Sequence, residues 1–416
     1  MRTIPPFCTS RAGRLTAAAL ALGLCVPASA QSPDPDLLAE ARAIARQMAG
    51  IRGLAILRPI DFEVSDKAKV TEYARASLSE QMSPGEWEAY EALLLHTGMM
   101  PPGTDLEDLV VRLYAEQIAG YYDPARKTFY LADWLPRLLQ RGVVAHEVTH
   151  ALQDQHFDLE RWLSAVSPTE DGALARAAVA EGDAMAAMIA FLLEPMGAGI
   201  EDLPPLSSLL EEAPPGMAAG YPTFDAAPRA LQRLLLFPYV EGSDFVREAL
   251  DRGGWNAVDR LYRDPPASTE QILHPDRYFD DRDEPRPVAL PSDAIARGLL
   301  TEGSWGEFGT GLALAATLAD TALAGVAAGG WDGDRYALSR DPGGPLRYVW
   351  VTLWDSPTMA ERFADAYAQA ALDRAPASAR ITTAEGRFDL ASPERTLRLV
   401  RRGDTVEIRE TSRNER

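Results

Sequence analysis

The sequence feature that most constrains this chain is a pair of histidines four residues apart, in the run HEVTH at residues 146–150. On an α-helix, residues at this spacing share one face, about 40° apart around the axis and about 6 Å apart along it. Both imidazoles can then bind one metal ion. Residues 143–157 contain no Gly or Pro and are apolar on either side of the motif, which predicts a helix. The chain has five histidines, and the number of such matches expected by chance is roughly 0.004.

A metal site on this helix would support hydrolysis. Zinc in enzymes takes three protein ligands and leaves a fourth position for water, whose pKa falls toward about 7. Glu147 directly follows His146, where its carboxylate can take a proton from that water and pass it to a leaving amine. We therefore expect His146 and His150 to be metal ligands and Glu147 to be the general base. The competing interpretation is a surface helix whose histidines face solvent.

Two residues compete for the position of third ligand. His156 fits the pattern H-E-x-x-H-x-x-G-x-x-H, but Gln153 replaces the glycine at which such a helix ends. A helix that continues turns His156 about 240° away from His150. Glu181 lies in an otherwise apolar helix predicted over residues 173–193. A buried carboxylate is costly unless it is paired or binds a metal, and this cost favours Glu181.

The motif and its flanks resemble a known family. Residues 143–152 resemble the active-site helix of thermolysin-like zinc peptidases, and a downstream helix that supplies a glutamate is the gluzincin arrangement. The resemblance implies Zn²⁺ held by His146, His150 and Glu181, with Glu147 as the catalytic base. It covers roughly residues 105–285, with a fainter echo over 330–336. The flanking runs that are similar to those of poorly characterised exported gluzincin-like bacterial proteins are LQDQ (152–155), EGDA (181–184) and STEQILHP (268–275).

The residues around Glu181 carry further expectations. Gly182 permits a second helix to approach closely. Thermolysin has an acid four residues after its ligand glutamate, and Met185 stands there in this chain, so that bracing role is not carried over. Asp183 is a candidate to brace a ligand histidine instead. The acids at 170–171 follow Pro-Thr at the expected helix start, where the helix dipole accounts for them.

A peptidase also needs a hydrogen-bond donor for the oxyanion that forms when water attacks the carbonyl. Gluzincins use a His or Tyr from beyond the ligand glutamate, and by this resemblance His274 is the leading candidate. Tyr262 and Tyr239 are the alternatives. The resemblance also implies that the strand before the metal helix, residues 127–131, binds substrate by backbone pairing.

The first thirty residues are typical of a cleaved secretory signal. Three arginines precede an uncharged apolar run over residues 15–26, and the small residues 28–30 suit a signal peptidase. The run is too short for a stable anchor, because a membrane-spanning helix takes about 20 residues. We expect export to the periplasm or the extracellular space, and both cysteines, Cys8 and Cys25, leave with the signal.

The charge of the chain limits its partners. Lys plus Arg number 41 against 61 Asp plus Glu, which gives a net charge of -20. This charge repels polyanions, so it argues against nucleic acid and against anionic membrane surfaces as partners. The expected partner is a peptide or protein substrate.

Hydrophobic periodicity predicts a predominantly helical α+β protein. We expect a signal peptide over residues 1–30 and a zincin-like catalytic domain over 31–291, with a small sheet beside the metal helix. Residues 195–228 are rich in Pro and Gly and are expected to form a connection or lid. An α+β domain over residues 292–416 follows, and it offers no catalytic constellation.

Individual elements are expected at the following positions. The first domain is expected to have helices over residues 83–95, where Ser83 and Glu86 predict a capping box, over 105–119 and over 173–193. Further helices are expected from 230 to 274, the last of them capped near Ser268. Its strands are expected over 54–64, 120–123 and 127–131, the last two as a hairpin. The second domain has helices over 305–327 and 356–373, strands over 335–339 and 347–354, and a hairpin over 396–410. Asp332-Gly333-Asp334 is expected to be a turn, since it lacks the further ligands of a calcium loop.

The sequence thus predicts an exported zinc metallopeptidase of gluzincin type. The alternative, from another functional class, is a zincin-like scaffold that keeps the metal or the shape but works in binding or assembly. Retention of Glu147 argues against the scaffold, because zinc binding requires only the ligands.

Overall fold

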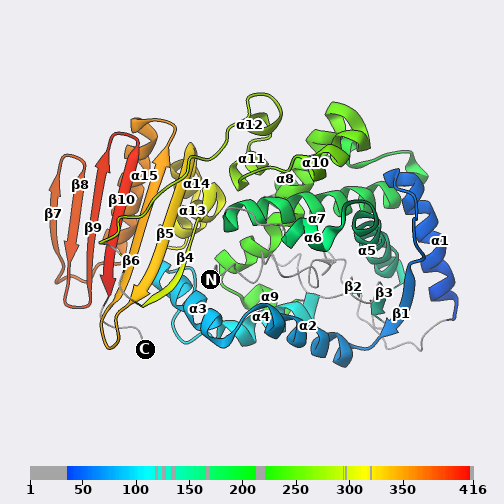
Figure 1. Cartoon of the computed structure of the whole chain (residues 1–416), viewed down its shortest axis with the longest axis horizontal. Coiled ribbons are helices and arrows are strands. Elements are labelled where there is room, and N and C mark those ends of the chain that lie inside the picture. The colour runs from blue at the N-terminus through cyan, green and yellow to red at the C-terminus, as the bar shows by residue number, and fades with distance from the viewer. Residues whose placement is uncertain are drawn as a thin grey trace.

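The computed structural model describes residues 35–117, 120–123, 128–132, 137–164, 169–211, 221–293, 295, 298–318 and 321–412. The predicted signal peptide, the turn of the predicted hairpin and residues 212–220 of the predicted lid lie outside this described part. Figure 1 shows a group of helices, one of which carries the HEVTH motif, at one end of the molecule and a seven-stranded sheet at the other. The fold is therefore α+β with a large helical share, as the sequence predicts.

Helices make up most of the chain before residue 280. They are α1 (Pro35–Arg52), α2 (Lys67–Gln81), α3 (Pro84–Thr97), α4 (Leu106–Gln117), α5 (Arg137–Phe157), α6 (Leu159–Ser164), α7 (Glu170–Leu193), the 3₁₀ turns η1 (Glu194–Met196) and η2 (Ile200–Asp202), α8 (Leu206–Glu211), α9 (Pro222–Ala226), α10 (Arg229–Arg263), α11 (Thr269–Leu273) and α12 (Asp276–Phe279). Of the helices described, none is both long and apolar enough to cross a membrane.

Local sequence signals explain where several helices begin. The backbone N–H of Ser83 donates to the Glu86 carboxylate at 2.8 Å, which is the predicted capping box of α3. The side chain of Thr169 accepts from Gly172 N at the start of α7, and Ser268 accepts from Gln271 N at the start of α11. These caps satisfy backbone donors that a helix start would otherwise leave unpaired.

A three-stranded sheet lies beside α5. Its strands are β1 (Asp61–Ser65), β2 (Gly120–Asp123) and β3 (Thr128–Ala132), in the order β1-β3-β2. The predicted hairpin forms, because β2 pairs with β3 in antiparallel register. However, β1 pairs with β3 in parallel on the other side. The strand predicted to bind substrate, β3, is thus the central strand, and its described backbone is paired on both sides. The expectation that β3 binds substrate by backbone pairing was wrong because β1, a distant segment, occupies its other edge.

The second sheet holds most of the chain after residue 298. Its strands are β4 (Leu299–Gly303), β5 (Trp331–Arg340), β6 (Leu346–Trp354), β7 (Arg380–Ala384), β8 (Arg387–Ala391), β9 (Arg395–Arg402) and β10 (Thr405–Ser412). They are antiparallel throughout, in the order β4-β5-β6-β10-β9-β8-β7. Helix α13 (Gly306–Ala315) packs against β5, α15 (Pro357–Asp373) packs against β6, β9 and β10, and α3 packs against β4. Helix α14 (Thr321–Ala328) packs against α13 and α15.

Three expectations for this region were wrong. The Ala-rich helix predicted over 305–327 is two helices, α13 and α14. The run Asp332-Gly333-Asp334 lies within β5, where the register shifts, and is not a turn. Asp334 is buried there and accepts hydrogen bonds from the indoles of Trp331 and Trp350. The sequence also missed β4, β7 and β8, which are short; β7 is exposed along its whole length and so lacks the alternation that marks a half-buried strand.

The buried side chains form three clusters. One joins α1, the small sheet, α5 and the end of α7. A second joins α6, α7 and α10. The third joins α2–α4 to the seven-stranded sheet and its helices, so residues 78–113 share one core with residues 313–408. The predicted domain boundary near residue 292 remains a prediction.

Candidate metal centre

The predicted metal helix forms as α5, and its two histidines face α7. Val144 and Val148 of α5 pack into the core that α5 shares with α1 and the small sheet. This packing fixes the rotation of α5 about its axis and leaves His146 and His150 on the face toward α7. Their ring centroids are 4.7 Å apart, and their Nε2 atoms are 3.1 Å apart.

Glu181 of α7 completes a group of three ligand atoms. Its Oε2 atom lies 3.1 Å from His146 Nε2 and 3.3 Å from His150 Nε2. Tetrahedral zinc with bonds of about 2.0–2.1 Å has ligand atoms about 3.3–3.4 Å apart. Two imidazole nitrogens and one carboxylate oxygen at 3.1–3.3 Å therefore fit three corners of a zinc site. All three side chains are buried.

The electrostatics of this group favour a bound cation. Burial raises the pKa of Glu181, but the charge of His150 and the hydrogen bond from His146 Nε2 outweigh it and hold that pKa below its usual value. Burial lowers the pKa of His146. Burial also acts to lower the pKa of His150, but the charge of Glu181 outweighs it, so the net shift is upward. These directions favour the anionic form of Glu181 and the neutral form of His146, which are the forms that bind metal, whereas for His150 the direction favours the protonated form.

Glu147 lies with this group and is fully buried. It follows His146 on the helix, so its carboxylate begins one residue around from a candidate ligand. Its charge and that of Glu181 both act on Tyr239. Glu147 therefore lies within electrostatic range of Tyr239, as Glu181 does.

A crossing of α7 and α10 at two glycines brings Tyr239 to the site. A Cβ atom on Gly182 would lie 2.2 Å from the carbonyl oxygen of Gly242, and one on Gly242 would lie 2.2 Å from the carbonyl oxygen of Ala178. Only glycine at both positions allows this approach, as the sequence predicts for Gly182. Since Tyr239 lies one turn before Gly242, the crossing places its ring beside the residues that surround Glu181.

Tyr239 stacks on a candidate ligand. Its ring centroid lies 6.1 Å from that of His146, with an interplanar angle of 27°. Burial, followed by the charge of Glu181, raises the pKa of Tyr239 well above 10. The phenol therefore keeps its proton at physiological pH and can act as a hydrogen-bond donor.

Tyr262, the other candidate tyrosine, has a different role. Its hydroxyl donates to Asp183 Oδ2 at 2.8 Å, and its ring stacks on Phe157 with centroids 4.1 Å apart. Tyr262 thus binds the carboxylate predicted to brace a ligand and does not face the three ligand atoms.

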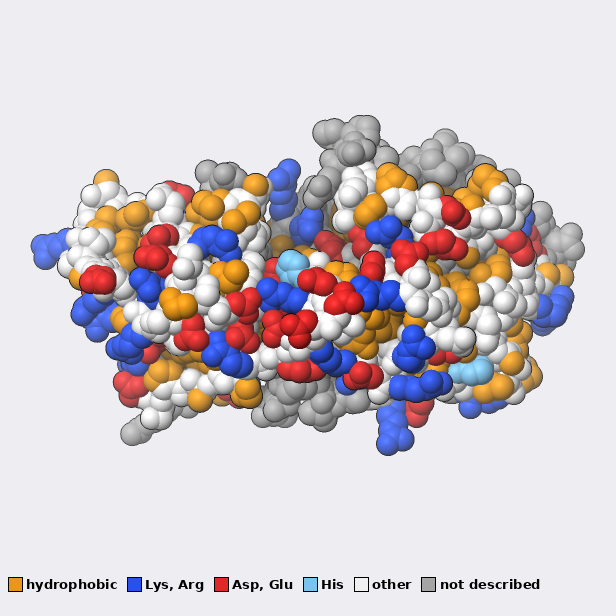
Figure 2. Space-filling view, turned by 90° about the horizontal axis from the view of Figure 1, so that it is seen from above, with side chains coloured by type: hydrophobic (Ala, Val, Ile, Leu, Met, Phe, Trp, Pro, Cys, Tyr) orange, Lys and Arg blue, Asp and Glu red, His pale blue; other side chains and the backbone are white. Residues whose placement is uncertain are grey.

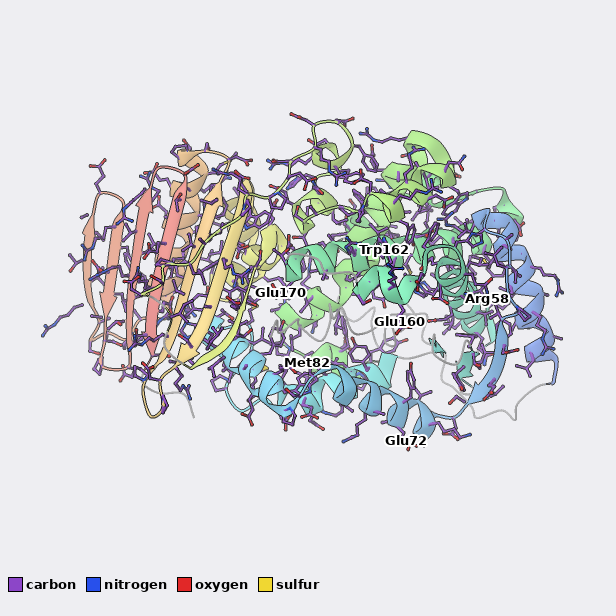
Figure 3. All side chains as sticks on the ribbon, in the orientation of Figure 1. Arg58, Glu72, Met82, Glu160, Trp162 and Glu170 are labelled. Atoms are coloured by element: carbon purple, nitrogen blue, oxygen red, sulfur yellow. The ribbon has the colours of Figure 1, made fainter. Side chains whose placement is uncertain are left out.

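His274 is not brought to the three ligand atoms. Its Nε2 atom binds Glu307 Oε1 at 2.8 Å, where α11 meets α13. Neighbouring residues of these helices contact Asp171, because Thr269 Oγ1 donates to it and a Cβ on Gly306 would overlap it. Asp171 lies about 15 Å along α7 from Glu181, from the rise of 1.5 Å per residue. Figure 3 shows the neighbouring Glu170 at the end of α7 nearest the seven-stranded sheet.

His156 also lies apart from the three ligand atoms. Its Nε2 atom donates to the carbonyl oxygen of Ala55 at 2.7 Å. Because α5 continues as a helix to Phe157, His156 is turned away from the face that carries His150.

Two residues that the sequence analysis did not assign to the site lie directly behind it. Gln153 Oε1 is 2.8 Å from His150 Nδ1, and Arg52 Nε donates to Asp183 Oδ1 at 2.6 Å. Gln153 could have been found, since it follows His150 by three residues and shares its helix face. Arg52 could not, because the end of α1 carries no signal that it lies against α7.

Comparisons with known proteins bear on the end of the chain alone. A family model described as a domain of unknown function (DUF8575) matches residues 297–415. No curated protein and no solved structure matches the chain. The matched region contains the seven-stranded sheet and begins after His274, so it includes none of the predicted site residues.

Proposed function

We propose that this chain is a zinc-dependent metallopeptidase of gluzincin type with a zincin-like catalytic region. The observation that carries the proposal is the meeting of His146 Nε2, His150 Nε2 and Glu181 Oε2 within 3.3 Å of one another. His146 and His150 come from α5 and Glu181 comes from α7. Glu147 directly follows His146, where a general base is expected.

Each of these residues would have a distinct role in peptide hydrolysis. His146, His150 and Glu181 would hold zinc, and the ion would supply a Lewis acid that polarises a peptide carbonyl and lowers the pKa of water. The Glu147 carboxylate accepts a proton from the attacking water and delivers it to the leaving amine. Its full burial strengthens this role, because electrostatic interactions are stronger where water is excluded.

We assign the oxyanion donor to Tyr239 in place of His274. The Tyr239 ring stacks on His146, and its phenol stays protonated, whereas His274 binds Glu307 near the other end of α7. A phenol donor placed before the reaction begins stabilises charge that develops on the carbonyl oxygen.

The substrate class and location are part of the same proposal. The apolar run after three arginines supports export, and the resemblance of residues 143–152 to the active-site helix of zinc peptidases supports a peptide or protein substrate. The net charge of -20 argues against polyanionic partners. The mass of the mature protein recovered from the periplasm or medium tests export, and a chain that begins after residue 30 is the expected result.

The proposal is tested with a peptide library and a matched pair of proteins. Wild type and Glu147→Gln are each loaded with zinc, the zinc content is measured, and cleavage is followed by mass spectrometry. Cleavage by wild type alone, with equal zinc in both, supports the peptidase. Equal zinc without cleavage by either protein would favour the zincin-like scaffold, an alternative that the burial of Glu147 and the ligands also supports.

A further inference from the structure

A chain of buried polar contacts leads from the end of α1 to His150. Arg52 is buried; its Nε donates to Asp183 Oδ1 at 2.6 Å, and its Nη2 lies 2.8 Å from Asp259 Oδ1. The guanidinium also lies over the Trp255 ring, 4.8 Å from the centroid. Arg52 thus ties α1 to α7 and α10 and fixes the position of Asp183.

Asp183 receives hydrogen bonds from three directions. Besides Arg52, the Tyr262 hydroxyl donates to Oδ2 at 2.8 Å, and Gln153 Nε2 donates to the same oxygen at 3.0 Å. Burial, followed by the charge of Asp183, raises the pKa of Tyr262 well above 10, so this hydroxyl keeps its proton. A carboxylate paired with a guanidinium has only acceptor atoms to offer.

These acceptors decide which way the Gln153 amide points. Its nitrogen faces both Asp183 Oδ2 and the carbonyl oxygen of Ala180, each at 3.0 Å. Neither partner can donate, so a flipped amide would place the single amide oxygen of Gln153 against two acceptors. The amide oxygen must therefore face His150 Nδ1, at 2.8 Å.

The amide orientation in turn selects the tautomer of His150. An amide oxygen only accepts, so the hydrogen bond requires a proton on His150 Nδ1. A neutral His150 then carries its free lone pair on Nε2, the atom that lies beside Glu181. In contrast, His146 Nδ1 has no hydrogen-bond partner among the residues the structure describes.

We propose that Asp183, held by Arg52 and Tyr262, orients Gln153 and through it holds His150 in the tautomer that presents Nε2 to a metal. This inference rests on the proposed function for its purpose, although the tautomer itself does not depend on zinc. Arg52, Asp183 and Gln153 are positioning residues, since none of them touches the ligand atoms. The two histidines then differ: the hydrogen bond to Gln153 fixes the tautomer of His150 before metal binds, and no such contact fixes that of His146 among the described residues.

The decisive variant is Asp183→Asn. Arg52 donates to both oxygens of Asp183, from Nε to Oδ1 at 2.6 Å and from Nη2 to Oδ2 at 3.2 Å. Because the contact to Oδ2 is the longer one, we expect the new amide nitrogen at that position, where it faces Gln153 as a donor. Gln153 then turns its own oxygen toward Asn and its nitrogen toward His150 Nδ1. We expect neutral His150 to change from the Nδ1–H to the Nε2–H tautomer, and zinc affinity to fall about 10- to 100-fold.

The matched control is Asp259→Asn, which removes the other carboxylate charge from Arg52 without touching Gln153. It should leave the tautomer of His150 unchanged and zinc affinity close to that of wild type. The double variant Gln153→Glu/Asp183→Asn should restore the Nδ1–H tautomer, because a carboxylate accepts from both neighbours. The restoration is partial, since the carbonyl of Ala180 loses its donor.

The measurement is the pair of ring ¹⁵N shifts of His150 in the full metal-free chain, at a pH where the ring is neutral, with Zn²⁺ affinity measured separately against a chelator. The proposal is supported if neutral His150 carries its proton on Nδ1 in wild type and on Nε2 in Asp183→Asn. An Nε2–H ring in wild type, or equal behaviour of Asp183→Asn and Asp259→Asn, overturns it. If Asp183→Asn does not fold, the wild-type tautomer still decides. Because this readout needs neither zinc nor cleavage, its failure is distinct from failure of the proposed peptidase.

Discussion

At the scale of single residues, α7 shows that burial alone does not decide the charge of a carboxyl group. Glu170, Asp171 and Glu181 are all buried on this helix. Burial raises the pKa of Glu170 and of Asp171 to about 7. The pKa of Glu181 is lowered instead, because two imidazoles lie within 3.3 Å of its carboxylate. An ionised acid in an apolar helix is thus explained by its partners on α5, and the three side chains together form the candidate metal centre.

The third ligand is tested by Glu181→Gln. The substitution keeps the shape of the side chain but removes its charge, so we expect zinc per chain to fall from one in wild type to near zero under chelator-buffered conditions. His156→Ala is the control and should keep its zinc, because His156 binds the carbonyl of Ala55. Elemental analysis of the purified proteins measures both. Loss of zinc from His156→Ala but not from Glu181→Gln would show that His156, and not Glu181, is the third ligand.

The oxyanion donor is tested by Tyr239→Phe. The variant lacks only the phenol hydroxyl, so we expect kcat/KM on a cleaved peptide to fall about 10²- to 10³-fold while zinc content stays the same. His274→Gln is compared in the same assay and should retain most activity, since His274 lies against Glu307. The opposite ranking of the two variants would return the role to His274.

At the scale of elements, the crossing of α7 and α10 is the contact that builds the site. Gly182 follows the candidate ligand Glu181, and Gly242 lies one turn after Tyr239. Their backbones approach so closely that neither position has room for a Cβ atom. A side chain at Gly182 must therefore separate the two helices and move Tyr239 away from His146.

Gly182→Ala is accordingly expected to destabilise the protein by about 1–3 kcal/mol or more, because the added Cβ would lie 2.2 Å from a backbone oxygen. Urea unfolding of metal-free protein measures the change. Gly85→Ala, in α3, is the matched control: nothing lies within 4 Å of its added Cβ, and Ala favours a helix over Gly. Equal stability of the two variants would show that the helices do not cross so closely.

The start of α7 meets a segment that precedes α13. Ser304 N donates to Glu170 Oε2 at 3.0 Å, and Thr269 N lies 3.2 Å from both oxygens of Asp171. The positive φ of Gly306, 69°, brings its backbone against Asp171, where a Cβ would overlap the carboxyl group. The helix dipole is therefore only part of the explanation for these acids, since both contact the C-terminal region of the chain.

These contacts predict a pH dependence. Burial raises the pKa of Asp171 to about 7, against about 3.9 in an unfolded chain. A carboxyl group with a raised folded-state pKa contributes stability that is fully present below about pH 4 and is lost as the pH rises through about 7. Asp171→Asn should therefore gain stability relative to wild type across this interval, by on the order of a few kcal/mol.

Urea unfolding of metal-free protein between pH 4 and 8 checks this dependence. Asp108→Asn, on the exposed face of α4, serves as the control, and its free energy of unfolding should change with pH as that of wild type does. A constant difference between Asp171→Asn and wild type at every pH would refute the shift.

At the scale of the whole molecule, the beginning and the end of the chain share a core. His96 of α3 lies 3.2 Å from Glu410 of β10, and its ring is tilted against that of Tyr348 of β6, with centroids 5.0 Å apart. Burial acts to raise the pKa of Glu410, but the charges of Arg395 and His96 hold it well below its usual value.

Figure 2 shows acidic and basic side chains gathered across the middle of one face. Near α12, Arg277 pairs with Asp355, which follows β6.

A chain that ends at residue 296 is therefore expected to lose the fold of α3 and α4. Removing the seven-stranded sheet would expose their buried side chains, which belong to the cluster shared with that sheet. We expect a lower unfolding temperature and rapid proteolysis within residues 78–113, compared with the full chain. Circular dichroism and limited proteolysis measure both. An unchanged unfolding temperature would show that the first part of the chain is an independent domain.

The sequence alone determined the elements whose signals are local. The HEVTH run and its apolar flanks predicted α5, the capping residues predicted the starts of α3 and α11, and the cost of a buried carboxylate selected Glu181 for the third position. Each inference needs only neighbours within a few turns, because helix periodicity, capping and burial are read over short windows.

Only the tertiary structure decided which distant segments meet. It placed β3 between two partners, Asp334 in a strand, His274 against Glu307, Tyr239 on His146, and Arg52 behind Asp183. Strand order, helix crossings and buried polar contacts depend on packing between segments far apart in the chain, for which a single sequence carries no periodic signal.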